Sequence, residues 1–269
     1  MKTYFGKLSF VLLLLMMLSG FAGCGNQNAE QTEHTLTFTD ALGRSVTVSQ
    51  EPKRVAALLG SFADVWVLSG GSVCATAEDA WEDFELELED AVSLGGAHSP
   101  NLELLLSAEP DFVLASASTA SNLEMREILE AAEIPVAYFD IDHFEDYLQM
   151  LSICTDITGR KDLYEKNGLA VQRKIDAVRT GVSEHGLTDQ ERTVLLLRAS
   201  SGFVKAKGST GTILGEMLQD LDCINIADSD VLLLENLSVE SVIRQNPQHI
   251  FVVTMGNDTE KALYIICIV

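Results

Sequence analysis

Short apolar runs recur along this 269-residue chain, and a segment with helical spacing follows each of them. The runs in the first half of the chain lie at residues 54–59, 73–77, 111–115 and 136–139. Unbroken apolar runs of this length fit strands that are buried on both faces, as in a parallel sheet. The helical segments between them lie at residues 62–68, 102–107 and 123–132. Strands that alternate with helices in this way predict βαβ units around a parallel sheet, preceded by a hairpin at residues 36–48.

A long helical segment separates these strands from a second set. Residues 161–182 contain no proline and carry apolar side chains that lie mostly three or four positions apart. A helix of this length spans roughly 30 Å, which is far more than a crossover between neighbouring strands needs. Beyond it, strands are predicted at residues 193–197, 203–205, 223–226 and 249–253, and helices at 212–221 and 239–245.

The predicted fold class is therefore α/β, with two Rossmann-like lobes joined by one long rigid helix. Each lobe is expected to be a parallel sheet flanked by helices, with a ligand cleft between the lobes. The predicted boundaries are 36–158 for the N-terminal lobe, 159–183 for the connecting helix and 184–269 for the C-terminal lobe.

The first 23 residues have the layout of a secretory signal peptide. Lys2 and Lys7 accompany the apolar stretch 8–18, and small residues lead to Cys24. This ending looks like a bacterial lipobox, in which the cysteine is lipidated and becomes the mature N-terminus. Residues 24–35 then form a flexible tether, and we expect a lipid-anchored protein on the extracytoplasmic face of the cell membrane. The alternative is ordinary secretion, with Cys24 as a bystander.

The charge and the motifs exclude several classes of function. The net charge is −22 at neutral pH, so the overall field of the chain disfavours binding to nucleic acid or to an anionic membrane surface. Ser61 follows a glycine but lacks the second glycine of a nucleophile elbow, and no catalytic partners for it are evident. Residues 208–212 have the wrong order of residues for a phosphate-binding loop. We therefore expect no enzyme, no cofactor and no nucleic-acid partner.

Candidate ligand-binding residues follow from the position of the strand ends. Ligands of open α/β sheets bind beyond the carboxyl ends of the strands. In the first lobe this rule selects Ser61, Trp81, His98, Ser116 and His143. The structural alternatives are a helix cap for Ser61 and core packing for Trp81. His98 and His143 are also weak candidates for direct metal ligation, because a closed transition-metal site needs three or four ligands.

The candidates in the second lobe are Arg198, Lys205 and Glu235. Arg198 ends an apolar strand and Lys205 lies close to it in the sequence, which suggests an anionic ligand such as a ferric siderophore. The alternatives are an ion pair of Arg198 within the lobe and a lysine that discourages pairing at a strand edge. With Ser116, Arg198 and Glu235 would give the cleft the convergent polar groups that a purely structural lipoprotein lacks.

Several segments carry a resemblance to a known family: residues 38–44, 52–55 leading to Ser61, 100–103 leading to 109–111, and 237–240 leading to 246–247. Over residues 36–258 the chain resembles the substrate-binding lipoproteins of ABC importers for iron-siderophores, haem and cobalamin, the class with a rigid helical connector. The resemblance implies that the protein captures an iron-siderophore or a related metal chelate and delivers it to permease subunits in the membrane. Haem, cobalamin or a bare transition metal are the alternative ligands.

The same resemblance assigns Glu103 and Glu240 to docking on arginines of the permease. Two carboxylates at opposite ends of a rigid body would set its orientation and speed the encounter. The alternative is that each acid favours a helix start, through the helix dipole or a capping box.

The end of the chain departs from the family pattern. Members would continue beyond about residue 258 with a helix, a strand and a closing helix, whereas residues 264–269 form a short apolar stretch. We therefore expect the second lobe to be truncated.

Overall fold

The computed structural model describes residues 34–254. The predicted signal peptide, Cys24, most of the tether and the apolar end of the chain lie outside the described residues. The strands are β1 Thr35–Thr39, β2 Ser45–Ser49, β3 Val55–Ala57, β4 Val73–Thr76, β5 Val92–Ser93, β6 Phe112–Ser116, β7 Val136–Phe139, β8 Thr193–Ala199, β9 Val204–Lys207, β10 Ile224–Asn225 and β11 His249–Thr254. The α-helices are α2 Gly60–Leu68, α3 Asp79–Glu82, α4 Leu102–Ser107, α5 Ala120–Glu124, α6 Arg126–Ala131, α7 Phe144–Thr158, α8 Lys161–Tyr164, α9 Ala170–Glu184, α10 Ile213–Asp220, α11 Val231–Glu235 and α12 Val239–Gln245.

A parallel sheet forms the centre of residues 34–158, which we call the first lobe. Its strand order is β5-β4-β3-β6-β7, and every neighbouring pair is parallel. The predicted βαβ arrangement is confirmed here. The predicted hairpin is also present, since β1 pairs antiparallel with β2. The patterns did not predict β5 and α3, because elements of two and four residues are too short to show a period.

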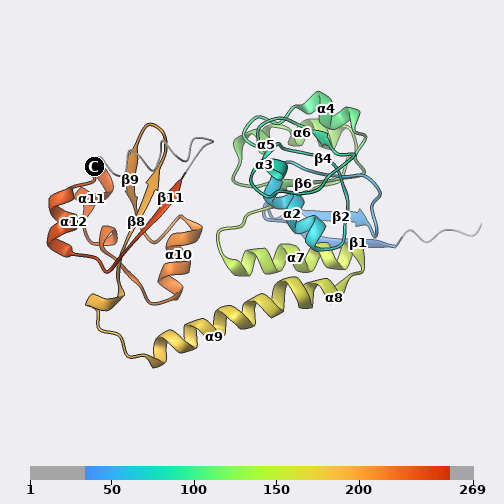
Figure 1. Ribbon diagram of the computed structural model, residues 1–269. Helices are drawn as coiled ribbons and strands as arrows, with labels where there is room; N and C mark the ends of the chain where they lie inside the picture. The colour runs from blue at the N-terminus through green and yellow to red at the C-terminus, as the bar shows by residue number, and fades with distance from the viewer. Residues whose placement is uncertain (1–33, 255–269) are drawn as a thin grey trace, which may run out of the picture. The chain divides into compact units, whose positions relative to one another are not determined.

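The strands of this sheet are buried on both faces. Val55 and Ala57 of β3 belong to the core on the side of α2 and α7. Ala56, between them, belongs to the core on the side of α4 and α6. Figure 1 shows α4 and α6 on one side of the strands and α7 on the other. Burial of successive side chains on opposite faces explains why these strands appear in the sequence as unbroken apolar runs.

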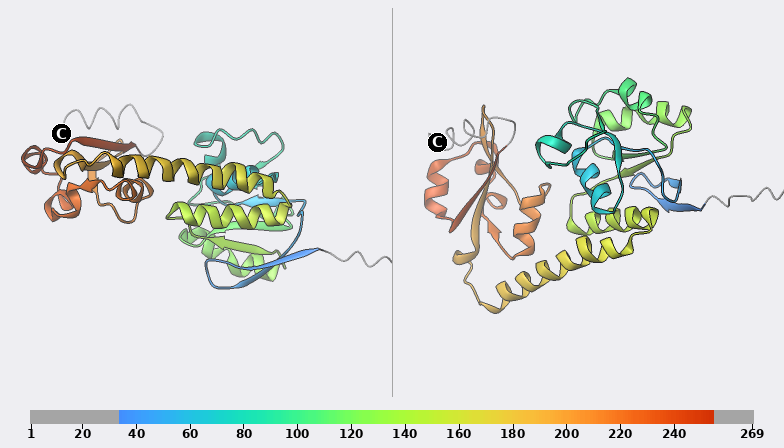
Figure 2. Two further views of the ribbon diagram at one scale, coloured as in Figure 1. Left: turned by 90° about the horizontal axis from the view of Figure 1, so that it is seen from below. Right: turned by 45° about the vertical axis from the view of Figure 1, so that its right-hand side comes forward.

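The connecting helix contains a turn of a different kind. It runs from α8 through a π-helical turn, Glu165–Leu169, into α9, and Figure 2 shows it as one continuous helix. The π-turn lies against the first lobe, where the Asn167 side chain donates a hydrogen bond of 2.7 Å to the carbonyl of Leu68. No residue of α9 is buried. The helix is therefore tied to the first lobe at its start and exposed beyond it.

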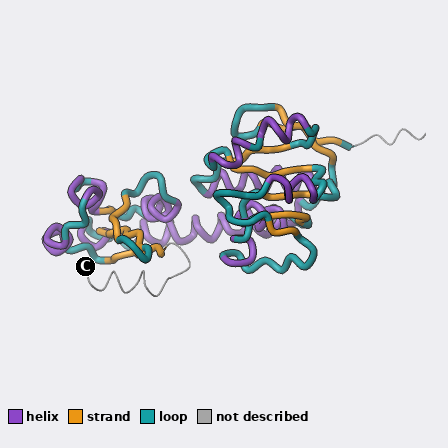
Figure 3. Tube along the Cα trace, turned by 90° about the horizontal axis from the view of Figure 1, so that it is seen from above, coloured by secondary structure: helices purple, strands orange, loops and turns teal. Residues whose placement is uncertain are grey.

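Strand β8 is the centre of the sheet in residues 193–254, which we call the second lobe. Strands β10 and β11 pair with it in parallel, whereas β9 pairs with it antiparallel. This departure from a purely parallel sheet arises because only residues 200–203 connect β8 to β9, and a parallel crossover needs a much longer connection. Leu195 and Leu197 of β8 pack with Leu233 of α11 in the core of this lobe. Figure 3 shows the strands of both lobes in orange, with helices around them.

Candidate functional site

A cavity of about 310 Å³ lies at the carboxyl ends of β3 and β6, and we call it the polar cavity. Its polar lining is made of Ser61, Asp64, Ser116, Ser118, Thr119 and Tyr147. The rest of the lining is apolar and consists of Leu59, Phe62, Val65, Phe84, Ile141 and Ile213, of which Ile213 comes from the start of α10 in the second lobe. The cavity therefore lies where ligands of α/β sheets bind, and it brings together Ser61 and Ser116 as the sequence predicts.

Ser116 shapes the loop that borders the polar cavity. The residue is buried, and its Oγ accepts hydrogen bonds from the backbone N–H groups of Ser118 at 3.2 Å and Thr119 at 3.1 Å. The Thr119 hydroxyl donates a further hydrogen bond to the same atom at 3.0 Å. These hydrogen bonds to the Ser116 Oγ stabilise the turn after β6, and Ser118 and Thr119 of this turn line the cavity. The sequence pattern did not single out these two residues, although they lie only two and three positions beyond the end of β6.

Ser61 is not the cap of α2. The helix begins at Gly60 after the extended residue Leu59, and no side chain of the capping position bonds to it. The N–H of Gly60 instead donates to both carboxylate oxygens of Asp79, each at 3.0 Å. A carboxylate from α3 thus satisfies the helix start. The capping alternative for Ser61 is therefore wrong, and its side chain lines the cavity.

Asp64 lies one turn after Ser61 on α2 and also lines the polar cavity. Burial raises the pKa of its carboxyl group. Burial also raises the pKa of the Tyr147 phenol, and the charge of Asp64 adds to this shift. The Tyr147 hydroxyl donates a hydrogen bond of 2.9 Å to the carbonyl of Asn167 in the π-turn. The cavity thus contains a half-buried acid, and no basic side chain is among its lining residues.

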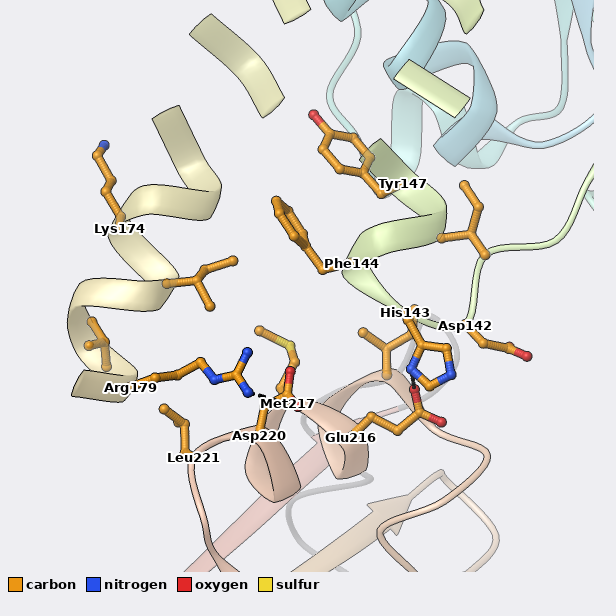
Figure 4. A pocket seen from close by; sticks show the side chains of 14 residues that line it. Asp142, His143, Phe144, Tyr147, Lys174, Arg179, Glu216, Met217, Asp220 and Leu221 are labelled. Atoms are coloured by element: carbon orange, nitrogen blue, oxygen red, sulfur yellow. Dashed lines mark ion pairs between the residues drawn. The ribbon is translucent and has the colours of Figure 1, made fainter. Parts of the chain in front are cut away.

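A second cavity of about 470 Å³ lies between α7, α9 and α10, and we call it the apolar cavity (Figure 4). Most of its lining is apolar: Ile141, Phe144, Tyr147, Ile175, Val178, Ile213, Met217 and Leu221. Ile141, Tyr147 and Ile213 line both cavities. The two spaces are therefore neighbours that share part of one wall.

His143 reaches from the first lobe to the second at the edge of the apolar cavity. Its backbone N–H precedes α7 and donates to the Asp146 carboxylate at 2.9 Å. Its ring atom Nδ1 lies 2.6 Å from Oε2 of Glu216 on α10. Figure 4 shows the two side chains pointing toward one another. The predicted site residue His143 thus lines a cavity, and Glu216 is a partner that sequence reasoning missed.

Two other predicted residues of the first lobe lie away from both cavities. Trp81 on α3 is half-buried and packs against the core that contains α2, as its structural alternative proposed. His98 is exposed in the turn after β5. Neither is among the lining residues of the polar or the apolar cavity. Within residues 34–254, no three or more His, Cys, Asp or Glu side chains gather where they would hold a metal ion.

The predicted residues of the second lobe also lie outside the two cavities. Arg198 of β8 is half-buried and stands directly opposite the exposed Lys205 of β9. Directly opposed residues share one face of a sheet, and like charges there repel. The ammonium group of Lys205 lies 5.5 Å from the centre of the Phe203 ring. Glu235 is exposed at the end of α11.

Glu103 and Glu240 have the same local setting in the two lobes. Each is the second residue of a helix whose start is capped by the residue two positions before it, Asn101 or Ser238. A capping box would require the acid one position later. Both glutamates are exposed. The capping-box alternative is therefore wrong for both, and the favourable interaction with the helix dipole remains.

Comparisons with known proteins agree with this architecture. A family model described as periplasmic binding protein matches residues 55–263. The chain is 27% identical to the Fe(3+)-citrate-binding protein YfmC of Bacillus subtilis, over 94% of this chain and 81% of the relative. It is 23% identical to the uncharacterized ABC transporter substrate-binding lipoprotein YvrC of the same organism, over 93% of this chain and 81% of the relative. Its fold is similar to that of Staphylococcus aureus SirA complexed with staphyloferrin B, with a TM-score of 0.64, 21% identity and coverage of 86% and 81% of the two chains.

Proposed function

Because the chain belongs to the periplasmic binding protein family, we propose that it captures an iron chelate outside the cell and delivers it to an ABC permease. The protein is a solute-binding protein and not an enzyme. The observation that carries the proposal is the pair of adjoining cavities, whose shared wall residues Ile141, Tyr147 and Ile213 come from both lobes. A ligand in this space would contact both halves of the protein at once.

The polar cavity supports a ligand with many oxygen atoms. The hydroxyl groups of Ser61 and Ser118 can donate hydrogen bonds to the carboxylate, hydroxamate or catecholate oxygens of a chelate. Its volume of about 310 Å³ lies at the lower end of the range of small-molecule sites, roughly 300–1,000 Å³. The relative YfmC is named for ferric citrate, a chelate of this class.

The second lobe supports a negative charge on that ligand. Arg198 and Lys205 stand opposite one another on one face of the sheet, and a bound anion would relieve their repulsion. Glu235 would then be a polar contact at the margin of the site. These three assignments, and those of Trp81 and His98, require the ligand to extend beyond the two cavities.

We assign the contact with the permease to Glu103 and Glu240. Both are exposed, both leave the capping of their helices to another side chain, and one lies on each lobe. Glu103→Arg combined with Glu240→Arg is expected to abolish uptake of the ligand by cells and to leave its affinity for the purified protein unchanged. Glu127→Arg combined with Glu184→Arg makes the same change in charge at other exposed helix positions and should leave uptake intact. Normal uptake by the first double variant would refute this assignment.

Attachment to the membrane is proposed to depend on Cys24. No helix within residues 34–254 is long and apolar enough to cross a bilayer. Acyl chains on a cysteine contribute about 0.8 kcal/mol per buried methylene, so two or three chains hold a protein at a membrane surface. Cys24→Ala is expected to abolish the incorporation of a labelled fatty acid into the protein, and equal labelling of the variant and the wild type would contradict the lipid anchor.

Calorimetric titration of the purified protein tests the function itself. The panel consists of ferric citrate, a ferric trihydroxamate, a ferric catecholate, haemin and cobalamin. We expect saturable binding of one iron chelate class. Ser118→Phe, which places a ring at the polar cavity, should weaken this binding at least tenfold, whereas Ser107→Phe on the exposed end of α4 should not. A folded protein that binds no member of the panel would refute the proposal.

A further inference from the structure

The apolar cavity has walls that suit a hydrocarbon chain. Ile175 and Val178 come from α9, Met217 comes from α10, and Leu221 follows that helix. The rings of Phe144 and Tyr147 pack against one another with their centres 5.4 Å apart. The other apolar wall residues are aliphatic apart from Met217, whose side chain can adapt to the shape of an occupant.

Four of the six acidic or basic residues that line this cavity lie in two close pairs, and Asp142 and Lys174 are the other two. His143 Nδ1 lies 2.6 Å from Glu216, and Arg179 Nη2 lies 3.8 Å from Asp220. Figure 4 shows the Lys174 side chain extending away from the other labelled side chains. The apolar side chains of α9 and α10 therefore offer the larger share of the wall to an occupant.

The cavity leaves apolar side chains accessible to water in the structure as it stands. Val178 is 55% exposed, Ile213 is 60% exposed and Met217 is 53% exposed. Single apolar residues scattered over a surface are common, whereas these three all border one cavity. An apolar occupant would cover all three side chains and gain the hydrophobic free energy of doing so.

The apolar cavity also adjoins the polar cavity, through the shared residues Ile141, Tyr147 and Ile213. One ligand can therefore place an oxygen-rich group beside the serines and a hydrocarbon group between α7, α9 and α10. We propose that the apolar cavity binds the aliphatic tail of an amphiphilic chelate, a molecule in which a fatty acyl chain is attached to an iron-binding head. Binding of the iron-binding head in the polar cavity rests on the proposed function, whereas binding of an acyl chain in the apolar cavity does not depend on it.

The first test uses a tail without a chelating head. The fluorescent fatty acid 11-(dansylamino)undecanoic acid brightens when it enters an apolar cavity. We expect saturable brightening with the wild-type protein and displacement of the probe by decanoate. Val178→Asp places a carboxylate in the cavity wall and should weaken binding of the probe at least tenfold. Val171→Asp makes the same change at another exposed position of α9, outside the cavity, and should have no effect.

The second test measures what the tail adds to a chelate. Ferric N-acetyl-desferrioxamine and ferric N-decanoyl-desferrioxamine have the same head and the same charge, and differ only in the length of the acyl chain. A fully buried methylene increases affinity roughly fourfold. Even with incomplete burial of the chain, the decanoyl complex should bind at least about 30-fold more tightly. Val178→Asp should reduce this ratio below about threefold, and Val171→Asp should leave it unchanged.

The outcomes separate the two proposals. Equal affinities for the two complexes, or no brightening of the fatty acid probe, would overturn the tail site while leaving the chelate function in place. Brightening that Val178→Asp abolishes, together with no binding of any iron chelate, would support the tail site and refute the chelate function. A ratio that Val171→Asp lowers as much as Val178→Asp would also overturn the tail site.

Discussion

The sharpest prediction concerns Gly60, where α2 begins. A Cβ atom at this position would lie 2.3 Å from the backbone nitrogen of Ala80 and 2.7 Å from its Cα. Both contacts are with backbone atoms, so no side chain can rotate to make room. Gly60→Ala must therefore push α2 and α3 apart by roughly 1 Å.

The cost follows from two terms. Overpacking of this kind costs about 1–3 kcal/mol. The displacement also weakens the hydrogen bonds from the Gly60 N–H to the Asp79 carboxylate, and a hydrogen bond to a charged group contributes about 1.5–3 kcal/mol. We expect Gly60→Ala to lower the free energy of unfolding by about 2–5 kcal/mol.

Gly181→Ala is the matched control, since an added Cβ there meets no atom within 4 Å and the residue lies inside α9. This variant should gain about 0.5–1 kcal/mol, because alanine loses less backbone entropy than glycine in a helix. Urea unfolding followed by circular dichroism, with the slope of the transition checked for two-state behaviour, measures both variants. A Gly60→Ala protein within about 0.5 kcal/mol of the wild type would refute the close packing of α2 on α3.

Three titratable groups give further expected outcomes. Burial opposes ionisation of Asp40, but hydrogen bonds from Arg44 and nearby backbone N–H groups outweigh it and lower the pKa of this carboxyl group. Asp40→Asn should therefore lower the free energy of unfolding by about 1.5–3 kcal/mol at pH 7, and by progressively less as the pH falls below about 4. A loss of stability that does not change with pH would contradict this. Burial raises the pKa of Asp64, so the charged carboxylate lowers the stability of the protein above about pH 4. The Asp64→Asn variant should unfold at an equal or slightly higher urea concentration than the wild type at pH 7, with no such gain at pH 3. A clear loss of stability at pH 7 would contradict this. Burial raises the pKa of the Cys154 thiol. Of the three cysteines in the described part of the chain, Cys154 should therefore react last with Ellman's reagent. Early labelling of Cys154, detected by mass spectrometry, would refute its burial.

The elements with long, strong patterns were the ones that the sequence could predict. Apolar runs such as 111–115 match β6 closely, because a strand buried on both faces must be apolar at every position. The helical spacing of residues 161–182 likewise predicted the connecting helix. The π-turn within it was not predicted, since inserting one residue into a helical turn leaves the surrounding apolar spacing almost unchanged.

The candidate site was predicted less completely than the fold. Ser61, Ser116 and His143 were found because each lies just beyond a strand, where the topology of the sheet places ligands. Asp64 and Glu216 were missed because they are ordinary helix acids in the sequence. Their importance arises from neighbours that are remote along the chain, such as Tyr147 for Asp64 and His143 for Glu216.

Local periodicity and the polarity of each segment thus determined which parts of this chain become strands and helices, because burial on one or two faces leaves a repeat that can be read residue by residue. The tertiary structure alone decided which polar and apolar side chains share a cavity. Ile213 and Tyr147 line the same two cavities, and Glu216 pairs with His143, because the tertiary structure brings α10 close to α7. Contacts between segments so far apart in sequence leave no repeat in either segment, so only the folded chain reveals them.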